Sequence, residues 1–208
     1  MLLAMAETCY GEAKTYQREF YALRAAEQNW LGRHELMLTK KPDDIFWIDE
    51  VRDFYRTRSA TPRFVVMLRD PRAVLTSVHA KYKGYYVSCE RWRAIYDQYC
   101  YARTSPDVMT VKFEELVTTP AIVQETFSEF IGWRPEGSFE RFHEAVPETF
   151  SAAPLNGVRP LDPFSVDRWR APRHRERRRE ILRGIPELPE ILIEMGYERD
   201  SQWVQSYT

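Results

Sequence analysis

The chain has 208 residues, of which 44% are hydrophobic, so it is long enough to bury the core of one globular domain over residues 1–208. Its formal net charge of -1 excludes a chain-wide attraction to nucleic acid, and no run reaches the roughly 20 apolar residues of a membrane span. The 3 cysteines fit no zinc-ligand pattern. We therefore expect a soluble, cytoplasmic protein with no metal and no nucleic-acid or membrane partner.

Helices and short strands are predicted to alternate from the start of the chain. Apolar residues at intervals of three, four and seven predict a helix over residues 12–30, and a short apolar stretch predicts a strand over residues 34–39. Pro42 and Asp43 mark the start of a second helix. The buried stripe of that helix is predicted to be Ile45, Ile48, Val51, Phe54 and Tyr55.

The clearest strand is the apolar run of residues 64–68, which suits a parallel sheet covered on both faces. Asp70 and Pro71 then resemble an N-cap and a first helical residue, predicting a helix over about residues 71–81. Arg69 stands between strand and helix. Since helix N-terminal amides attract anions, Arg69 could bind a phosphate there, or it could instead pair with Asp70 as a cap.

A second strand, turn and helix follow. Residues 108–113 predict the strand, Thr119 and Pro120 a helix start, and Gly132 the helix end. Alternation of this kind indicates an α/β fold with a central parallel sheet. Ligands of such folds gather beyond the carboxyl ends of the strands, where Arg69 and Glu114 stand.

The last third of the chain is less periodic. Residues 134–172 are rich in proline and predict a long loop or flap over the sheet edge. Seven arginines lie between positions 168 and 179, which could form a nucleic-acid patch. Because Glu176 and Glu180 interleave with them, we interpret residues 173–183 as a solvated helix face.

The stretch from Phe64 to Ser77, with its apolar strand and its Arg-Asp-Pro-Arg sequence, resembles the 3′-phosphate motif of the sulfotransferase family. These enzymes transfer a sulfuryl group from 3′-phosphoadenosine 5′-phosphosulfate (PAPS) to an acceptor. The resemblance implies that Arg69 and Ser77 bind the 3′-phosphate of PAPS or of its product, adenosine 3′,5′-bisphosphate. It also implies a three-layer fold related to the phosphate-loop proteins.

Residues 111–120 resemble the family's Arg-Tyr-Glu-Asp-Leu stretch, whose aromatic residue lies near the adenine. Phe113 takes that position here, with packing into the core as the alternative. The segment Arg168-Trp169-Arg170 resembles a late Arg-Trp segment of bacterial members, where a loop closes over the nucleotide. By this resemblance Arg170 is a nucleotide-binding residue.

Three catalytic candidates also come from the resemblance. Lys40 precedes Lys41 and Pro42, similar to a Lys-x-Pro turn of the tyrosylprotein and heparan-type branches, whose lysine touches the leaving oxygen. Glu12, which follows Gly11, matches the glutamate that acts as base, and Glu19 is the second choice. For all three, an ordinary solvated side chain is the alternative.

The family's N-terminal loop, whose amides hold the 5′-phosphosulfate, has no counterpart before Gly11. We expect an N-terminally truncated sulfotransferase domain that acts on a small-molecule, peptide or carbohydrate hydroxyl. The alternative is a non-catalytic nucleotide-binding or scaffolding protein derived from the same fold. A nucleotide kinase would need a Gly-rich Lys-Ser/Thr loop, which the sequence lacks.

Overall fold

The computed structural model describes Arg24, Leu38 and residues 42–56, 60–78, 84–145 and 158–207. The helix predicted over residues 12–30 and the strand predicted over residues 34–39 lie outside these residues, except for Arg24 and Leu38. The chain separates into two compact units, residues 1–62 and residues 63–208.

In the first unit, the helix predicted to start at Pro42 is confirmed. It begins as a 3₁₀ helix, η1 (Pro42–Trp47), and continues as α3 (Ile48–Arg56). The buried residues of α3 are Ile48, Val51 and Tyr55. Their spacing of three and four places them on one face, as the predicted stripe requires. The buried Arg24 is helical, and its guanidinium pairs with Asp44 at 3.1 Å.

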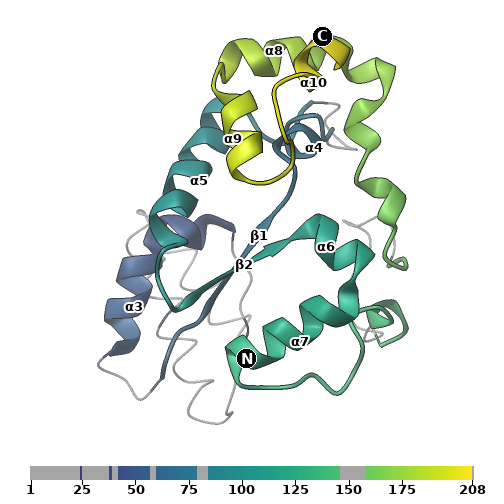
Figure 1. The fold of residues 1–208 in the computed structure, drawn as a ribbon. Helices are drawn as coiled ribbons and strands as arrows, with labels where there is room; N and C mark the ends of the chain where they lie inside the picture. The colour runs from purple at the N-terminus through teal and green to yellow at the C-terminus, as the bar shows by residue number, and fades with distance from the viewer. Residues whose placement is uncertain are drawn as a thin grey trace. The chain divides into compact units, whose positions relative to one another are not determined.

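In the second unit, two strands form a parallel sheet (Figure 1). Strand β1 (Phe64–Leu68) pairs along its whole length with β2 (Val108–Lys112). Leu68 lies opposite Lys112, so both strands end at the same edge. The mixed helix and strand content and the parallel pairing agree with the predicted α/β fold, and the described part of the sheet has these two strands.

Helices lie on both faces of β2. Thr110 contacts α5 (Cys89–Ala102), where its hydroxyl lies 3.4 Å from the Tyr99 hydroxyl. The neighbouring Val111 points to the opposite face and lines a hollow against α7 (Pro120–Ile131). The start and end predicted for α7 are confirmed. Gly132 ends it with a φ of 74°, a left-handed conformation that glycine adopts without strain.

The helix predicted over about residues 71–81 is wrong in its length, because α4 covers only Pro71–Leu75. The carbonyls that a longer helix would use have other donors. Arg177 Nε donates to the Leu75 carbonyl at 3.0 Å, and the Tyr86 amide donates to the Ser77 carbonyl at 3.0 Å. Ser77 therefore follows α4 and does not lie inside it.

The remaining helices complete the second unit. They are α6 (Phe113–Thr118), α8 (Arg175–Gly184), α9 (Leu188–Glu194) and α10 (Trp203–Tyr207). The largest fully buried side chains come from α4, α8 and α9 and from residues next to them: Leu75, Trp169, Ile181, Ile185, Leu188 and Leu192. Phe113, predicted as the last strand residue, is the first residue of α6.

The long loop predicted over residues 134–172 is confirmed for its described residues, in which the helical segments are single 3₁₀ turns. These are η2 (Phe142–Glu144), η4 (Pro163–Ser165), η5 (Arg168–Arg170) and the start of η6 (Pro172–His174). η4 contacts α6 and η5 contacts α4, so the loop lies against the helices that follow both strands. Among the described helices, none has the length and apolar character needed to cross a bilayer.

The solvated helix face predicted over residues 173–183 is only partly present. Arg178 is buried and donates to the carbonyls of Trp169 and Ala171 at 2.8 and 3.0 Å. Arg177 is also largely covered, since it bonds the Leu75 carbonyl and stacks on Tyr85. The sequence pattern missed both because their acceptors are backbone carbonyls, which leave no trace in the charge pattern.

Candidate functional site

The predicted meeting of the two strand ends is observed. The Asp70 amide, one residue past Arg69, donates to Glu114 Oε1 at 2.9 Å. The other carboxylate oxygen, Glu114 Oε2, accepts from the Tyr197 hydroxyl at 3.1 Å. Arg69 and Glu114 thus share the carboxyl edge of the sheet, the usual ligand side of α/β folds.

Arg69 and Phe113, both predicted to bind the nucleotide, lie together at this edge. The guanidinium carbon of Arg69 is 4.4 Å from the centre of the Phe113 ring, a cation–π contact. Such a stack covers one flat face of the guanidinium, whereas its N–H groups point outward in its plane. The N–H groups of Arg69 therefore point away from the Phe113 ring.

The donors of Arg69 lack acceptors in the described part of the chain. Its Nε is buried without a hydrogen-bond partner there, and none of the ion pairs between described residues includes its guanidinium. Burial lowers the pKa of Arg69 and the charge of Arg168 lowers it further, while Glu114 opposes the shift. A buried donor without a partner is rare in proteins, so the Nε of Arg69 is available to an acceptor that the described residues do not provide.

The alternative role for Arg69, capping through Asp70, is wrong, because Asp70 pairs with Arg72. Arg72 is 2% exposed and donates to Asp70 Oδ2 at 2.7 Å and to Glu198 at 2.5 Å. Its guanidinium carbon also lies 3.8 Å from the centre of the Trp169 ring and 4.7 Å from that of Trp203. We call these five residues the Arg72 cluster. The two rings lie nearly at right angles to each other, so Arg72 is held by ion pairs and by contacts with two aromatic rings within the protein.

The amides at the start of α4, predicted to attract an anion, already have acceptors. The Arg72 amide donates to Asp70 Oδ1 at 2.8 Å, and the amides of Ala73 and Val74 donate to the Asp70 carbonyl at 2.9 and 3.1 Å. That prediction is wrong because the Asp70 cap satisfies the helix locally. Attraction for an anion at this edge therefore has to come from Arg69.

Ser77 lies just beyond the other end of α4. Its hydroxyl donates to the Ala73 carbonyl at 2.7 Å, and its own carbonyl accepts from Tyr86. A serine hydroxyl has one proton to donate, so Ser77 could bond a phosphate only by releasing Ala73. The five residues of α4 span about 8 Å, which separates Ser77 from Arg69 along the helix axis.

Of the two arginines that flank Trp169, Arg168 is the one whose charge reaches Arg69. Arg168 pairs with Asp162 at 2.6 Å, and its side chain is 61% exposed. The predicted nucleotide-binding Arg170 pairs instead with Asp167 at 2.7 Å, and no contact joins it to Arg69 or Phe113 in the described residues. The sequence could not separate the two, because both arginines stand next to the same tryptophan.

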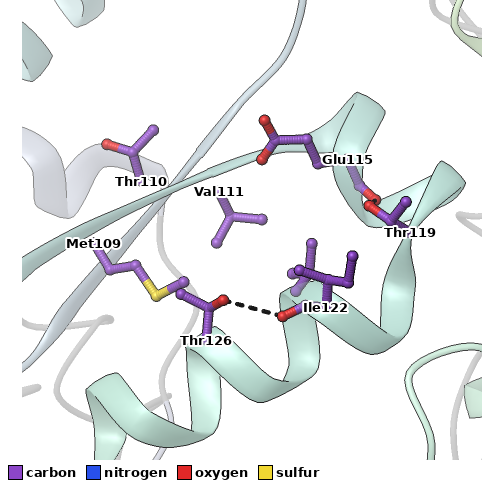
Figure 2. A pocket seen from close by; sticks show the side chains of 8 residues that line it. Met109, Thr110, Val111, Glu115, Thr119, Ile122 and Thr126 are labelled. Carbon is purple, nitrogen blue, oxygen red and sulfur yellow. Dashed lines mark hydrogen bonds between the residues drawn. The ribbon is translucent and has the colours of Figure 1, made fainter.

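A hollow beside β2 is distinct from this edge. Figure 2 shows Met109 and Val111 pointing into it from the strand, with Ile122 and Thr126 opposite on α7. Its lining is otherwise Thr110, Glu115, Thr119 and Val123. No cationic side chain lines the hollow, so it does not suit a phosphate.

The catalytic candidates Glu12, Glu19 and Lys40 lie outside the described residues and stay predictions. Within the described part of the chain, no group of three or more His, Cys, Asp or Glu side chains is placed to hold a metal ion. The chain matches no protein-family model and no curated protein.

Proposed function

We propose that this chain is a sulfotransferase-type protein that binds the 3′-phosphate of PAPS through Arg69. The observation that carries the proposal is Arg69 itself, a cation at the ligand edge of a parallel sheet whose buried Nε has no acceptor among the residues that the structure describes. The proposal includes the three-layer, phosphate-loop-like fold that the resemblance implies. The described two-stranded sheet is compatible with it.

An arginine suits this role better than a lysine. Its planar fork can give two parallel hydrogen bonds to the oxygens of one phosphate, and each is strengthened by charge. The ring of Phe113 lies against this guanidinium, with 4.4 Å between the guanidinium carbon and the ring centre. Arg168 could add a second positive charge on exchanging Asp162 for the ligand, since its pair with Asp162 is exposed and weak.

The transfer step would convert an acceptor hydroxyl into a sulfate ester. A bond forms between the acceptor oxygen and sulfur, and the bond between sulfur and the phosphate oxygen of PAPS breaks. Adenosine 3′,5′-bisphosphate leaves with that electron pair, and the hydroxyl proton passes to a base. In this proposal Glu12 or Glu19 is the base, and Lys40 stabilises the charge on the leaving oxygen.

Calorimetric titration tests the binding half of the proposal. We expect adenosine 3′,5′-bisphosphate to bind the wild-type chain more tightly than ATP does. Arg69→Ala should weaken the bisphosphate by roughly 10–100-fold, the loss expected for hydrogen bonds between charged groups. Arg63→Ala is the matched control, because Arg63 precedes the other end of β1 and stacks on Phe130 at 5.2 Å. Equal binding by wild type and Arg69→Ala would remove Arg69 from the site.

Turnover separates the two remaining functions. Release of bisphosphate from PAPS in the presence of an acceptor hydroxyl would support the sulfotransferase. Binding without turnover would support the non-catalytic nucleotide-binding alternative.

A further inference from the structure

Glu114 is the carboxylate whose charge acts most strongly on Arg69, yet the two form no ion pair. Both of its oxygens have neutral donors instead: the Asp70 amide at 2.9 Å and the Tyr197 hydroxyl at 3.1 Å. Two such bonds fix the orientation of a carboxylate group. The guanidinium of Arg69 is therefore not paired with the carboxylate of Glu114.

The bond to the Asp70 amide also joins the two strands beyond their last paired residues. Asp70 follows Arg69, and Glu114 follows Phe113, so this bond closes a short frame around the cation–π contact. Without it, the ends of β1 and β2 would be joined by the ladder that ends at Leu68 and Lys112 and by the cation–π contact. The frame thus sets where the guanidinium of Arg69 lies on the Phe113 ring.

Tyr197 brings the C-terminal part of the chain into this frame. Gly196, with a φ of 72°, turns the chain after α9, and the Tyr197 amide then donates to the Leu192 carbonyl at 2.8 Å. The Lys112 ammonium lies 4.9 Å from the centre of the Tyr197 ring. Tyr197 is therefore held by both α9 and the last residue of β2.

We propose that Glu114 and Tyr197 are positioning residues, which hold the end of β1 so that Arg69 presents its donors to an anion. The choice of anion rests on the proposed function, whereas the positioning itself does not. Because Glu114 is negative and close to Arg69, charge alone would make it weaken anion binding. Its hydrogen bonds, by holding Arg69 in place, would instead strengthen anion binding. The effect of the charge and the effect of the hydrogen bonds can therefore be told apart.

Two substitutions of Glu114 separate charge from geometry. Glu114→Gln removes the charge but keeps an acceptor for the Asp70 amide, and the Tyr197 hydroxyl can turn to accept from the new amide group. Glu114→Ala removes the charge and both bonds. We expect Glu114→Gln to bind adenosine 3′,5′-bisphosphate at least as tightly as wild type, and Glu114→Ala to bind it about 10-fold more weakly. Equal or tighter binding by Glu114→Ala would overturn the proposal.

Tyr197→Phe removes a single hydroxyl. We expect it to weaken the bisphosphate by about 3–10-fold, the loss of one modest hydrogen bond. Tyr96→Phe is the control, since the Tyr96 hydroxyl makes the same kind of bond, to Glu194 at 3.2 Å. Equal effects of the two substitutions would show a general loss of stability and not positioning.

The hydrogen-exchange rate of the Asp70 amide measures how firmly its bond to Glu114 is held, and it needs no ligand. The amide should exchange about 10-fold faster in Glu114→Ala than in wild type, and at the wild-type rate in Glu114→Gln. If the bisphosphate does not bind wild type, the proposed function fails and the exchange rates alone decide on the positioning pair. An unchanged rate in Glu114→Ala would refute that pair whatever the ligand.

Discussion

Arg69 and Arg72 stand three positions apart in one short segment but have opposite surroundings. Arg72 is 2% exposed, bonded to Asp70 and Glu198, and enclosed by the rings of Trp169 and Trp203. Arg69 has one aromatic face beneath it and a buried Nε without an acceptor in the described residues. An arginine therefore stabilises the fold at position 72, whereas at position 69 its Nε is available to a ligand.

The difference arises from parts of the chain distant in sequence. Besides its neighbour Asp70, the partners of Arg72 come from the loop containing η5 and from the residues after α9. At the strand end, the two oxygens of Glu114 accept hydrogen bonds from the Asp70 amide and the Tyr197 hydroxyl, so Glu114 does not form an ion pair with Arg69. A motif of two arginines does not reveal which of them binds a ligand until its distant partners are known.

The largest effect is expected from Arg72→Ala. It would leave the carboxylate of Asp70 buried without its partner, so we expect the free energy of unfolding to fall by about 3–5 kcal/mol. Arg72→Lys should not restore stability, because an ammonium cannot make the forked bonds to the carboxylates or the flat contact of a guanidinium with an aromatic ring. Denaturation in urea measures both.

Arg69→Ala is the comparison for this first prediction. It removes a partly buried cation whose Nε has no acceptor in the described part of the chain, so we expect the free energy of unfolding to change by less than about 1 kcal/mol. Similar losses for Arg69→Ala and Arg72→Ala would break the contrast between the two arginines.

Arg178→Ala should have the next largest effect. Arg178 donates to the carbonyls of Trp169 and Ala171 and so fixes the ring that lies on Arg72. Loss of these charge-assisted bonds should lower the free energy of unfolding by roughly 2 kcal/mol. Arg179→Ala is the control, since Arg179 lies next along α8 and its ion pair with Glu176 is exposed. Equal losses would show that burial of Arg178 adds nothing.

Local patterns in the sequence predicted the elements whose partners are near in the chain. The apolar run of β1 and the Pro120 and Gly132 boundaries of α7 are of this kind. Helix α5 was not predicted, although Trp92, Tyr96 and Tyr99 follow helical spacing after a Ser88 cap. This spacing and the cap are local features that were sufficient to predict the helix.

Other features depend on distant partners and could not be predicted. The early end of α4 depends on Arg177, about a hundred residues later, which takes the Leu75 carbonyl. At the candidate site, Arg69, Phe113 and Glu114 were found from strand-end positions and the resemblance. Tyr197 was missed because a single tyrosine after a helix carries no pattern that points to Glu114.

A smaller effect should appear in the pH dependence of stability. His174 is buried and accepts a hydrogen bond from Arg173 Nε at 3.1 Å, which requires a neutral ring. Burial lowers its pKa, and the charges of Arg173 and Arg178 lower it further. Below about pH 6.5 the ring therefore binds a proton in the unfolded chain but not in the folded chain. The free energy of unfolding decreases as the pH is lowered, until the ring of the folded chain also protonates.

His174→Asn should remove this contribution. One proton limits it to about 1.4 kcal/mol per pH unit, and it should vanish above pH 7, where the ring is neutral in both states. Urea denaturation between pH 5 and pH 8, wild type against variant, measures the difference in slope. Parallel curves would mean that the cations around His174 do not act on it.

The most direct measurement follows the side-chain Nε–H signals of the two arginines by NMR. Without ligand, the Arg72 signal should be protected from exchange, because its Nε donates to Asp70 at 3.0 Å, and the Arg69 signal should exchange faster. Adding adenosine 3′,5′-bisphosphate should shift and protect the Arg69 signal and leave the Arg72 signal unchanged. An Arg69 signal that stays unchanged at saturating bisphosphate would contradict the proposal that this arginine holds the phosphate.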